Sequence, residues 1–367
     1  MSLLQEGSII RGTYEVERFL GEGAFAEVYR VKHRFLGRQA MKVFKMVGMT
    51  IEETEQMLGE AIMLSRMGHP NIVRVFDANV TETSKGMCGF FTMEYVAGGS
   101  LEQFWRSHGT SFVPVPVAVD VLRQVCRGLA VAHCETPPVV HRDIKPQNIL
   151  VGYDAAGLRA RVSDFGLAKR VNPLTLLATV RGTRSFKAPE ALHDLKADSC
   201  AGDVWALGST LYLLLTDRLP FSEAGDTDGF DASMFARPMI PTSRLNMQVD
   251  PVLDQILLKS LSIDPAHRHL NAKELLDDLM LWVPSSDAAP AMGKRMSSDA
   301  SKSALGDHSP ANQEQSRKMA RQAVKLSRQS GQLSEAADLM EEAFNKWPAL
   351  REEYESRLRL WRRGIAM

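Results

Sequence analysis

The chain has 367 residues, enough for two or three domains, and its 44 Lys and Arg residues balance 44 Asp and Glu residues. This neutral charge, with 44% hydrophobic residues, argues against a nucleic-acid-binding protein. The N-terminus lacks a signal-peptide pattern and the apolar run Val204 to Leu215 is too short to span a bilayer, so we expect a cytoplasmic protein without membrane insertion.

The chain contains a region with strand-like sequence patterns followed by a region with helical patterns. From Tyr14 to about Val96 the pattern is mostly strand-like, with one helical interruption from about Ile51 to Met67. Beyond Gly99 longer helical patterns dominate, including Ala201 to Leu215 and Pro251 to Leu261. The expected fold is therefore α+β, with a small β-rich lobe followed by a larger α-helical lobe.

Residues 284–367 comprise a linker and a tail. Residues 284–311 contain seven Ser, three Pro, one Leu and no aromatic residue, which is typical of a flexible linker. Residues 312–367 are helical in pattern, and Gly331, Leu333, Ala336, Ala343 and Pro348 fall at the spacings of one tetratricopeptide repeat. A plain helical hairpin explains the same pattern, because Ala320 and Ala323 stand where Trp and Leu are usual. Either unit is a candidate site for a partner protein.

The N-terminal region carries a glycine-rich turn and a lysine in a strand. Gly21 and Gly23 lie between two strand patterns, where they suit either a phosphate-binding loop or a simple hairpin turn. Lys42 sits among the apolar residues of the run AMKV and needs a partner there. Glu60, on the Ile51 to Met67 helix, is the candidate partner that would hold Lys42 against phosphate oxygens.

The stretch HRDIKPQNIL, residues 141–150, places His, Arg, Asp, Lys and Asn side chains beside apolar runs. Phosphoryl transfer needs a carboxylate that accepts the proton of the attacking hydroxyl, cations beside the phosphates and oxygen ligands for Mg²⁺. Asp143 fits the base, Lys145 a contact to the γ-phosphate, and Asn148 a metal ligand. Asp164, in the later run SDFG, supplies a second carboxylate.

The order of these motifs resembles the eukaryotic-type serine/threonine protein kinase family. The family signature is a glycine-rich loop, an AxK lysine, a helix glutamate, HRDxKxxN, DFG and APE. This chain has GEGAFAEV, AMK, Glu60, HRDIKPQN, DFG and KAPE in that order, and the resemblance covers about Tyr14 to Val283. It implies a two-lobed kinase fold with ATP and Mg²⁺ as cofactors, Mn²⁺ being the alternative metal.

The resemblance also assigns the nucleotide site. Lys42, held by Glu60, would contact the α- and β-phosphates, and Asn148 and Asp164 would hold the metal. The residues that would cover the phosphates or enclose the adenine are Leu20, Gly21, Gly23, Val28, Ala40, Met93, Glu94, Val96 and Leu150. Among these, Met93 falls at the gatekeeper position and Glu94 to Ala97 at the hinge.

Substrate class and regulation follow from the same resemblance. Lys145 and Thr183 match the serine/threonine branch, so proteins with Ser or Thr are the expected substrates, and Arg268 would pair with Glu190 of APE. Arg184, Phe186 and Lys187 depart from the usual residues before APE, which leaves the peptide preference open. The residues that would take part in activation-loop phosphorylation are Thr175, Thr179, Arg142 and Lys169.

Two other classes of protein were weighed against an active protein kinase. A pseudokinase scaffold is disfavoured because Lys42, Asp143, Asn148 and Asp164 are all present. A small-molecule kinase is disfavoured by Thr183 and the APE segment. The expected domains are a kinase domain over residues 1–283, with lobes at about 13–96 and 97–283, a linker over 284–311 and a helical tail over 312–367.

Overall fold

The structure is a computed structural model that describes residues 2–23, 25–109, 112–165, 184–193, 197–221, 235, 237–284, 310–329 and 331–366. The chain divides into two compact units. Unit 1 comprises Met1–Val96 and Ser163–Val180, and unit 2 comprises Ala97–Val162 and Arg181–Met367. Each unit is described by itself.

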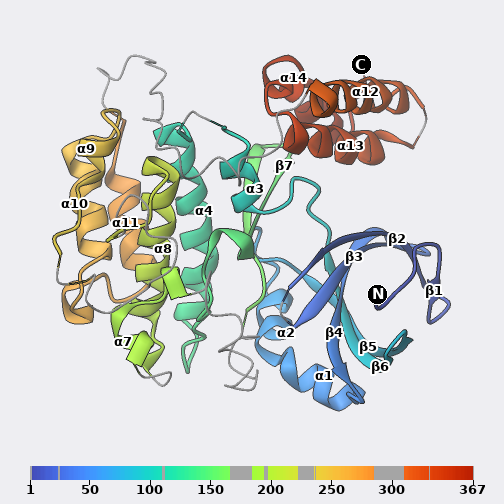
Figure 1. Cartoon of the computed structure of the whole chain (residues 1–367), viewed down its shortest axis with the longest axis horizontal. Helices are drawn as coiled ribbons and strands as arrows, with labels where there is room; N and C mark the ends of the chain where they lie inside the picture. Colours follow the sequence, from blue (N-terminus) through green and yellow to red (C-terminus); the bar gives the residue numbers. More distant parts are fainter. Residues whose placement is uncertain are drawn as a thin grey trace. The chain divides into compact units, whose positions relative to one another are not determined.

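Unit 1 is built on a six-stranded antiparallel sheet with the strand order β1-β2-β3-β4-β6-β5, drawn in blue to cyan in Figure 1. Its strands are β1 (Ile9–Ile10), β2 (Tyr14–Glu22), β3 (Ala26–His33), β4 (Gly37–Val47), β5 (Val75–Thr83) and β6 (Gly86–Glu94). Two helices, α1 (Ile51–Met57) and α2 (Gly59–Arg66), follow β4. The β-rich first lobe predicted from the sequence is confirmed.

The predicted helix from Ile51 to Met67 is two helices in the structure. Thr50 begins α1 with a capping box, in which its Oγ1 accepts from the Glu53 amide at 3.1 Å and its own amide donates to Glu53 Oε2 at 2.9 Å. The break falls at Leu58, directly before Gly59, which is the first residue of α2. Glycine has a low helix propensity, which gives the physical reason for the interruption.

One face of the sheet in unit 1 is buried by the N-terminus of the chain. Alternate strand residues such as Tyr29, Met41 and Val43 are fully buried, and Leu3 and Leu4 belong to the same hydrophobic cluster. We call residues 2–6 the N-terminal strap. No sequence pattern predicted this packing.

Unit 2 contains the helices of the second lobe and a two-stranded hairpin. Its core is α8, which is buried on nearly every side, with α4 and α11 packed against it. The elements up to residue 281 are α3 (Leu101–Arg106), α4 (Val115–His133), β7 (Ile149–Asp154), β8 (Gly157–Val162), α7 (Pro189–His193), α8 (Cys200–Thr216), α9 (Thr242–Leu245), α10 (Pro251–Ser260) and α11 (Ala272–Leu281), with 3₁₀ turns at Pro146–Asn148, Arg184–Phe186 and Pro265–His267.

The tail, residues 310–366, forms three helices within unit 2, shown in red in Figure 1. They are α12 (Pro310–Leu326), α13 (Leu333–Lys346) and α14 (Leu350–Arg362). Small buried residues, among them Ala320, Ala323 and Ala336, let α12 and α13 approach closely. The helical pair expected from the sequence is thus joined by a third helix, and the tetratricopeptide assignment stays a prediction.

The apolar run in α8 is a core helix. In the part of the chain that the structure describes, no helix combines the length and hydropathy needed to cross a bilayer.

Candidate active site

In unit 2, the side chain of Asp143 is held by two neighbours from its own loop. Lys145 Nζ donates to the two carboxylate oxygens at 3.0 and 2.9 Å, and Asn148 Nδ2 donates to Oδ2 at 2.9 Å. The same Asn148 nitrogen also donates to the Asp143 carbonyl at 2.8 Å. These contacts hold a partly exposed carboxylate in one orientation, as a general base requires.

The loop that carries Asp143 is anchored by hydrogen bonds to a buried carboxylate. Asp203, near the start of α8, accepts from the His141 amide at 2.7 Å and from the Arg142 amide at 2.9 Å. His133 Nε2 lies 3.0 Å from Asp203 Oδ2, while its Nδ1 accepts from the Ala272 amide at 3.1 Å. The imidazole therefore donates through Nε2 to the carboxylate.

The electrostatics of this anchor favour an ionised Asp203. Burial alone raises the pKa of its carboxyl, but the hydrogen bond and electrostatic attraction of His133, together with the hydrogen bond from the His141 amide, outweigh burial and hold the pKa below its usual value. Sequence reasoning missed both residues. The available signal was an acidic residue at the start of the otherwise apolar run DVWALG, because a carboxylate inside a buried helix needs partners.

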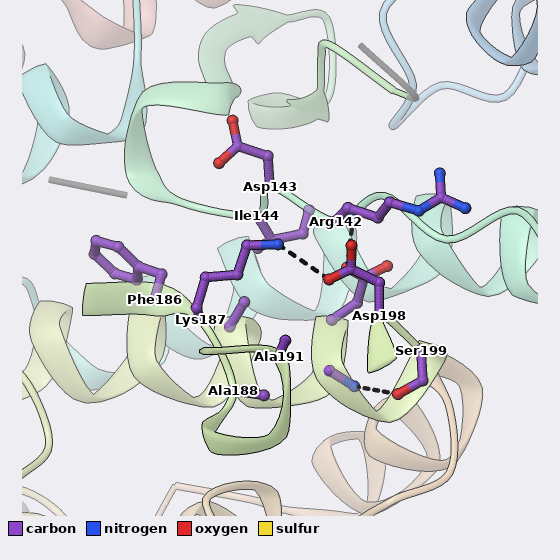
Figure 2. Close-up of a pocket in the computed structure, with 12 residues that line it drawn as sticks. Arg142, Asp143, Ile144, Phe186, Lys187, Ala188, Ala191, Asp198 and Ser199 are labelled. Carbon is purple, nitrogen blue, oxygen red and sulfur yellow. Dashed lines mark hydrogen bonds and ion pairs between the residues drawn. The ribbon is translucent and has the colours of Figure 1, made fainter. Parts of the chain in front are cut away.

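A pocket lies next to Asp143 and is drawn in Figure 2. Its apolar lining includes Phe186 and Ala206, and its charged lining includes Lys187, whose Nζ lies 3.0 Å from Asp198 Oδ1. In Figure 2 the Asp143 carboxylate points away from this ion pair.

Arg268 holds Glu190 of the APE segment. The Arg268 side chain is fully buried, and its two terminal nitrogens each donate to one oxygen of Glu190 at 2.7 Å. The guanidinium also lies over the Trp205 ring, 5.1 Å from the centroid. The structure thus brings together Arg268 and Glu190, which the family resemblance predicted to pair.

In unit 1, Lys42 lies on the face of the sheet opposite the N-terminal strap. The register places Lys42 directly across from Val28, and Ala40 directly across from Met93. Because side chains two residues apart on a strand point the same way, these four residues share one face. They form a continuous patch with one ammonium group among apolar side chains.

The partner of Lys42 in the structure is Asp164, whose Oδ1 lies 2.8 Å from Lys42 Nζ. The predicted partner Glu60 lies in α2, but its side chain is outside the described residues. Asp164 adopts a left-handed backbone conformation with φ of 63°, and Arg142 in unit 2 one with φ of 70°. Such conformations in non-glycine residues cost about 1–3 kcal/mol and cluster at functional sites.

The other predicted site residues fall in three groups. Those in unit 1 are Leu20, Gly21 and Gly23 on β2 and its turn, Glu94 at the end of β6, and Val96 just beyond it. Leu150 lies on β7 of unit 2, half-buried. Lys169, Thr175, Thr179 and Thr183 lie outside the described residues.

The described residues contain no group of three or more His, Cys, Asp and Glu side chains placed to hold a metal ion. The candidate metal ligands are instead oxygen atoms of single side chains. Because the Nδ2 end of the Asn148 amide donates to Asp143, the carbonyl Oδ1 is the end that can bind a cation. Asp164 offers a carboxylate in unit 1. Oxygen donors of this kind suit a hard divalent cation such as Mg²⁺.

Comparison with known proteins shows which family the chain is similar to. The protein kinase domain family matches residues 14–281 of the chain. The serine/threonine-protein kinase PknB of Mycolicibacterium smegmatis is 31% identical over 274 residues, which are 73% of this chain and 42% of that protein. PknB of Mycobacterium leprae is 30% identical over 298 residues, covering 80% of this chain and 46% of that one.

A solved structure gives the same result for the fold. The kinase domain of PknI from Mycobacterium tuberculosis aligns with a TM-score of 0.55 and 26% identity, covering 76% of this chain and 98% of that one. The chain spans only about 40% of the length of several of the curated relatives that it matches.

Proposed function

Because the chain belongs to the protein kinase family, we propose that it is an ATP-dependent protein kinase that phosphorylates serine and threonine residues of other proteins. One observation carries this proposal: the Asp143 carboxylate is held by Lys145 and Asn148, in a loop anchored on Asp203. A scaffold that only binds partners would have no need of a base fixed in this way.

In the proposed reaction, Asp143 orients the substrate hydroxyl and accepts its proton as the oxygen attacks the γ-phosphorus of ATP. The bond between the γ-phosphorus and the bridging oxygen then breaks, and ADP leaves. The Lys145 ammonium, which lies beside the same carboxylate, compensates negative charge on the transferred phosphoryl group. The two contacts on Asp143 keep its carboxylate from rotating away from the hydroxyl.

The nucleotide half of the site is the patch of unit 1. Lys42 would contact the α- and β-phosphates, while Val28, Ala40 and Met93 offer an apolar surface to the adenine. Leu20, Gly21 and Gly23 would cover the phosphates, with Glu94 to Val96 and Leu150 completing the adenine site. The apolar character of this patch beside a single ammonium supports a ligand with an apolar ring and a charged tail.

Mg²⁺ is the proposed metal, and Asn148 and Asp164 are its proposed ligands. When bound, the cation would neutralise phosphate charge. Asp143 would remain outside the metal site, since both of its oxygens receive hydrogen bonds from within its loop.

Peptide substrates would enter the pocket beside Asp143, with the Lys187–Asp198 pair facing the residue next to the acceptor. Thr183, Glu190 and Arg268 are proposed to shape this segment. Phosphorylation of Thr175 or Thr179 is proposed to regulate it through Arg142 and Lys169.

The test is transfer of labelled phosphate from ATP with Mg²⁺ to a generic protein substrate, followed by identification of the phosphorylated amino acids. Wild type should yield phosphoserine or phosphothreonine, and Asp143→Ala should reduce the rate about 10²- to 10⁴-fold. Asp277→Ala is the matched control, because Asp277 is an exposed carboxylate that pairs with Lys273 on the surface of α11.

Two results would overturn the proposal. The first is wild-type rates in Asp143→Ala. The second is measurable ATP binding without phosphate transfer by any form of the protein, which would indicate a nucleotide-binding scaffold.

A further inference from the structure

The hydrophobic core of the tail includes a residue from outside the tail. Tyr153, on β7, packs against the cluster formed by α12, α13 and α14. Its ring meets the buried Phe344 ring edge-on, with centroids 6.2 Å apart and planes at 78°. Burial raises the pKa of the Tyr153 hydroxyl to about 12. The β7–β8 hairpin therefore completes the core of the tail.

A buried carboxylate lies at the same contact. Glu341 on α13 has only 1% of its side chain exposed. Its Oε1 accepts from Arg362 Nη2 at 2.6 Å, from Arg362 Nε at 3.0 Å and from the Tyr153 amide at 3.3 Å. Arg363 Nε adds a second bond to the hairpin, to the Ala155 carbonyl at 2.9 Å. A buried carboxylate is destabilising unless its oxygens accept hydrogen bonds, and the Tyr153 amide of the hairpin supplies one of the donors.

The tail also contacts the segment that pairs with β7. Asn345 Nδ2 donates to the Ala97 carbonyl at 3.3 Å. Two residues further on, the Gly99 carbonyl accepts from the Val151 amide at 2.8 Å. The approach is so close that a Cβ at Gly98 would lie 2.1 Å from the Val151 carbonyl oxygen. The tail thus holds both the hairpin and the strand-like segment beside it.

The position of β7 in the chain gives this contact a functional meaning. The strand begins at Ile149, directly after the proposed metal ligand Asn148, and carries Leu150, a proposed adenine contact. Any displacement of β7 would shift both residues, because one backbone segment carries them.

We propose that the tail is a positioning element of the kinase itself: by docking on the β7–β8 hairpin, it fixes Asn148 and Leu150 for nucleotide and metal binding. This inference rests on the proposed function for its kinetic consequences, but the docking and its effect on ATP binding are measurable without phosphate transfer. Asn345, Arg363 and Tyr153 are positioning residues, since they act through β7.

The test uses the full chain with the double substitution Asn345→Ala and Arg363→Ala. Each of these side chains bonds to the rest of unit 2 through one backbone carbonyl, so the variant keeps the apolar core of the tail. Gln322→Ala with Arg357→Ala is the matched control, because both side chains are exposed on the tail. Tyr153→Leu is a second, independent variant that removes the ring contact and keeps an apolar side chain.

Three quantities are measured in each protein: amide hydrogen exchange over residues 149–162, the Kd for ATP with Mg²⁺, and kcat with KM for ATP. The double variant and Tyr153→Leu should exchange faster in this segment. Their Kd and KM for ATP should rise about three- to tenfold, with kcat changed less than about twofold. The control should match wild type in all three.

Faster exchange with an unchanged Kd for ATP would overturn the proposal, because the tail would then dock without positioning the site. Unchanged exchange would also overturn it, because the tail would not be docked. Absence of phosphate transfer in wild type would refute the proposed function alone, since exchange and the Kd still decide the role of the tail.

Discussion

Replacement of Arg268 by Met should be among the most destabilising single substitutions in unit 2. The guanidinium is fully buried and makes five hydrogen bonds. Two go to Glu190 and the other three to the carbonyls of Ser262, Ala201 and Ile263 at 2.7, 3.1 and 3.1 Å. Met occupies a similar volume without any donor, so the substitution isolates the polar loss from the packing loss.

The loss in free energy of unfolding follows from the buried groups that remain without a partner. Removing one partner of a buried ion pair typically costs about 3–5 kcal/mol. Three carbonyls lose their donors at the same time, which places Arg268→Met at the upper end of about 3–5 kcal/mol. A typical domain has only about 5–15 kcal/mol of stability, so the loss would be a large fraction of the total.

Glu190→Gln should cost less, about 1–3 kcal/mol, because it leaves Arg268 with its three carbonyl acceptors. In addition, 21% of the Glu190 side chain is exposed, so water can reach it. The two substitutions should not be additive, because both remove the same pair.

Urea denaturation followed by far-UV circular dichroism measures these losses. Arg244→Met is the matched control, since Arg244 is exposed on α9 and its replacement should stay within about 0.5 kcal/mol of wild type. The reasoning fails if Arg268→Met loses less than about 1 kcal/mol, or if Glu190→Gln loses as much as Arg268→Met.

Three further predictions concern the N-terminal strap and the metal. Leu3 is 2% exposed, so Leu3→Ala should destabilise unit 1 by about 2–5 kcal/mol in a thermal melt, whereas Ile9→Ala, at a 60% exposed position, should have little effect. Burial raises the pKa of Glu27, but hydrogen bonds from Tyr29, the Leu3 amide and Ser2 outweigh burial and hold this pKa below its usual value. The stability that these hydrogen bonds provide is therefore present above pH about 4.5 and is lost as the pH falls. Glu27→Gln should flatten this acid limb in a plot of melting temperature against pH. Asn148→Ala should raise the Mg²⁺ concentration that supports half-maximal ATP binding, and a titration in which wild type and variant coincide would count against Asn148 as a ligand.

The motifs that predicted the site share one physical property: each holds its reacting residues within a short stretch of chain. Asp143, Lys145 and Asn148 lie within six positions, so local loop geometry brings them together wherever the loop folds. The same holds for the strand alternation that puts Ala40 and Lys42 on one face. Patterns of this length are readable in the sequence.

What could not be predicted depends on contacts between distant residues. The His133–Asp203 pair joins positions seventy residues apart, and neither residue was predicted to be part of the site. The strap residue Leu3 lies in a stretch without periodicity, and its burial depends on strands that follow later in the chain. Tyr153 reads as an ordinary strand residue until the tail, almost two hundred residues on, packs against it.

The two ends of the chain support the two parts of the candidate site in the same physical way. In unit 1 the N-terminal strap packs against Met41 and Val43, the two strand neighbours of Lys42, on the opposite face of the sheet. In unit 2 the tail packs on the strand that begins after Asn148. In each unit the packed residues lie on the strand that carries or directly follows the candidate ligand-binding side chain. Because backbone displacements pass directly between adjacent residues, loosening either end should affect ligand binding before it affects the overall fold.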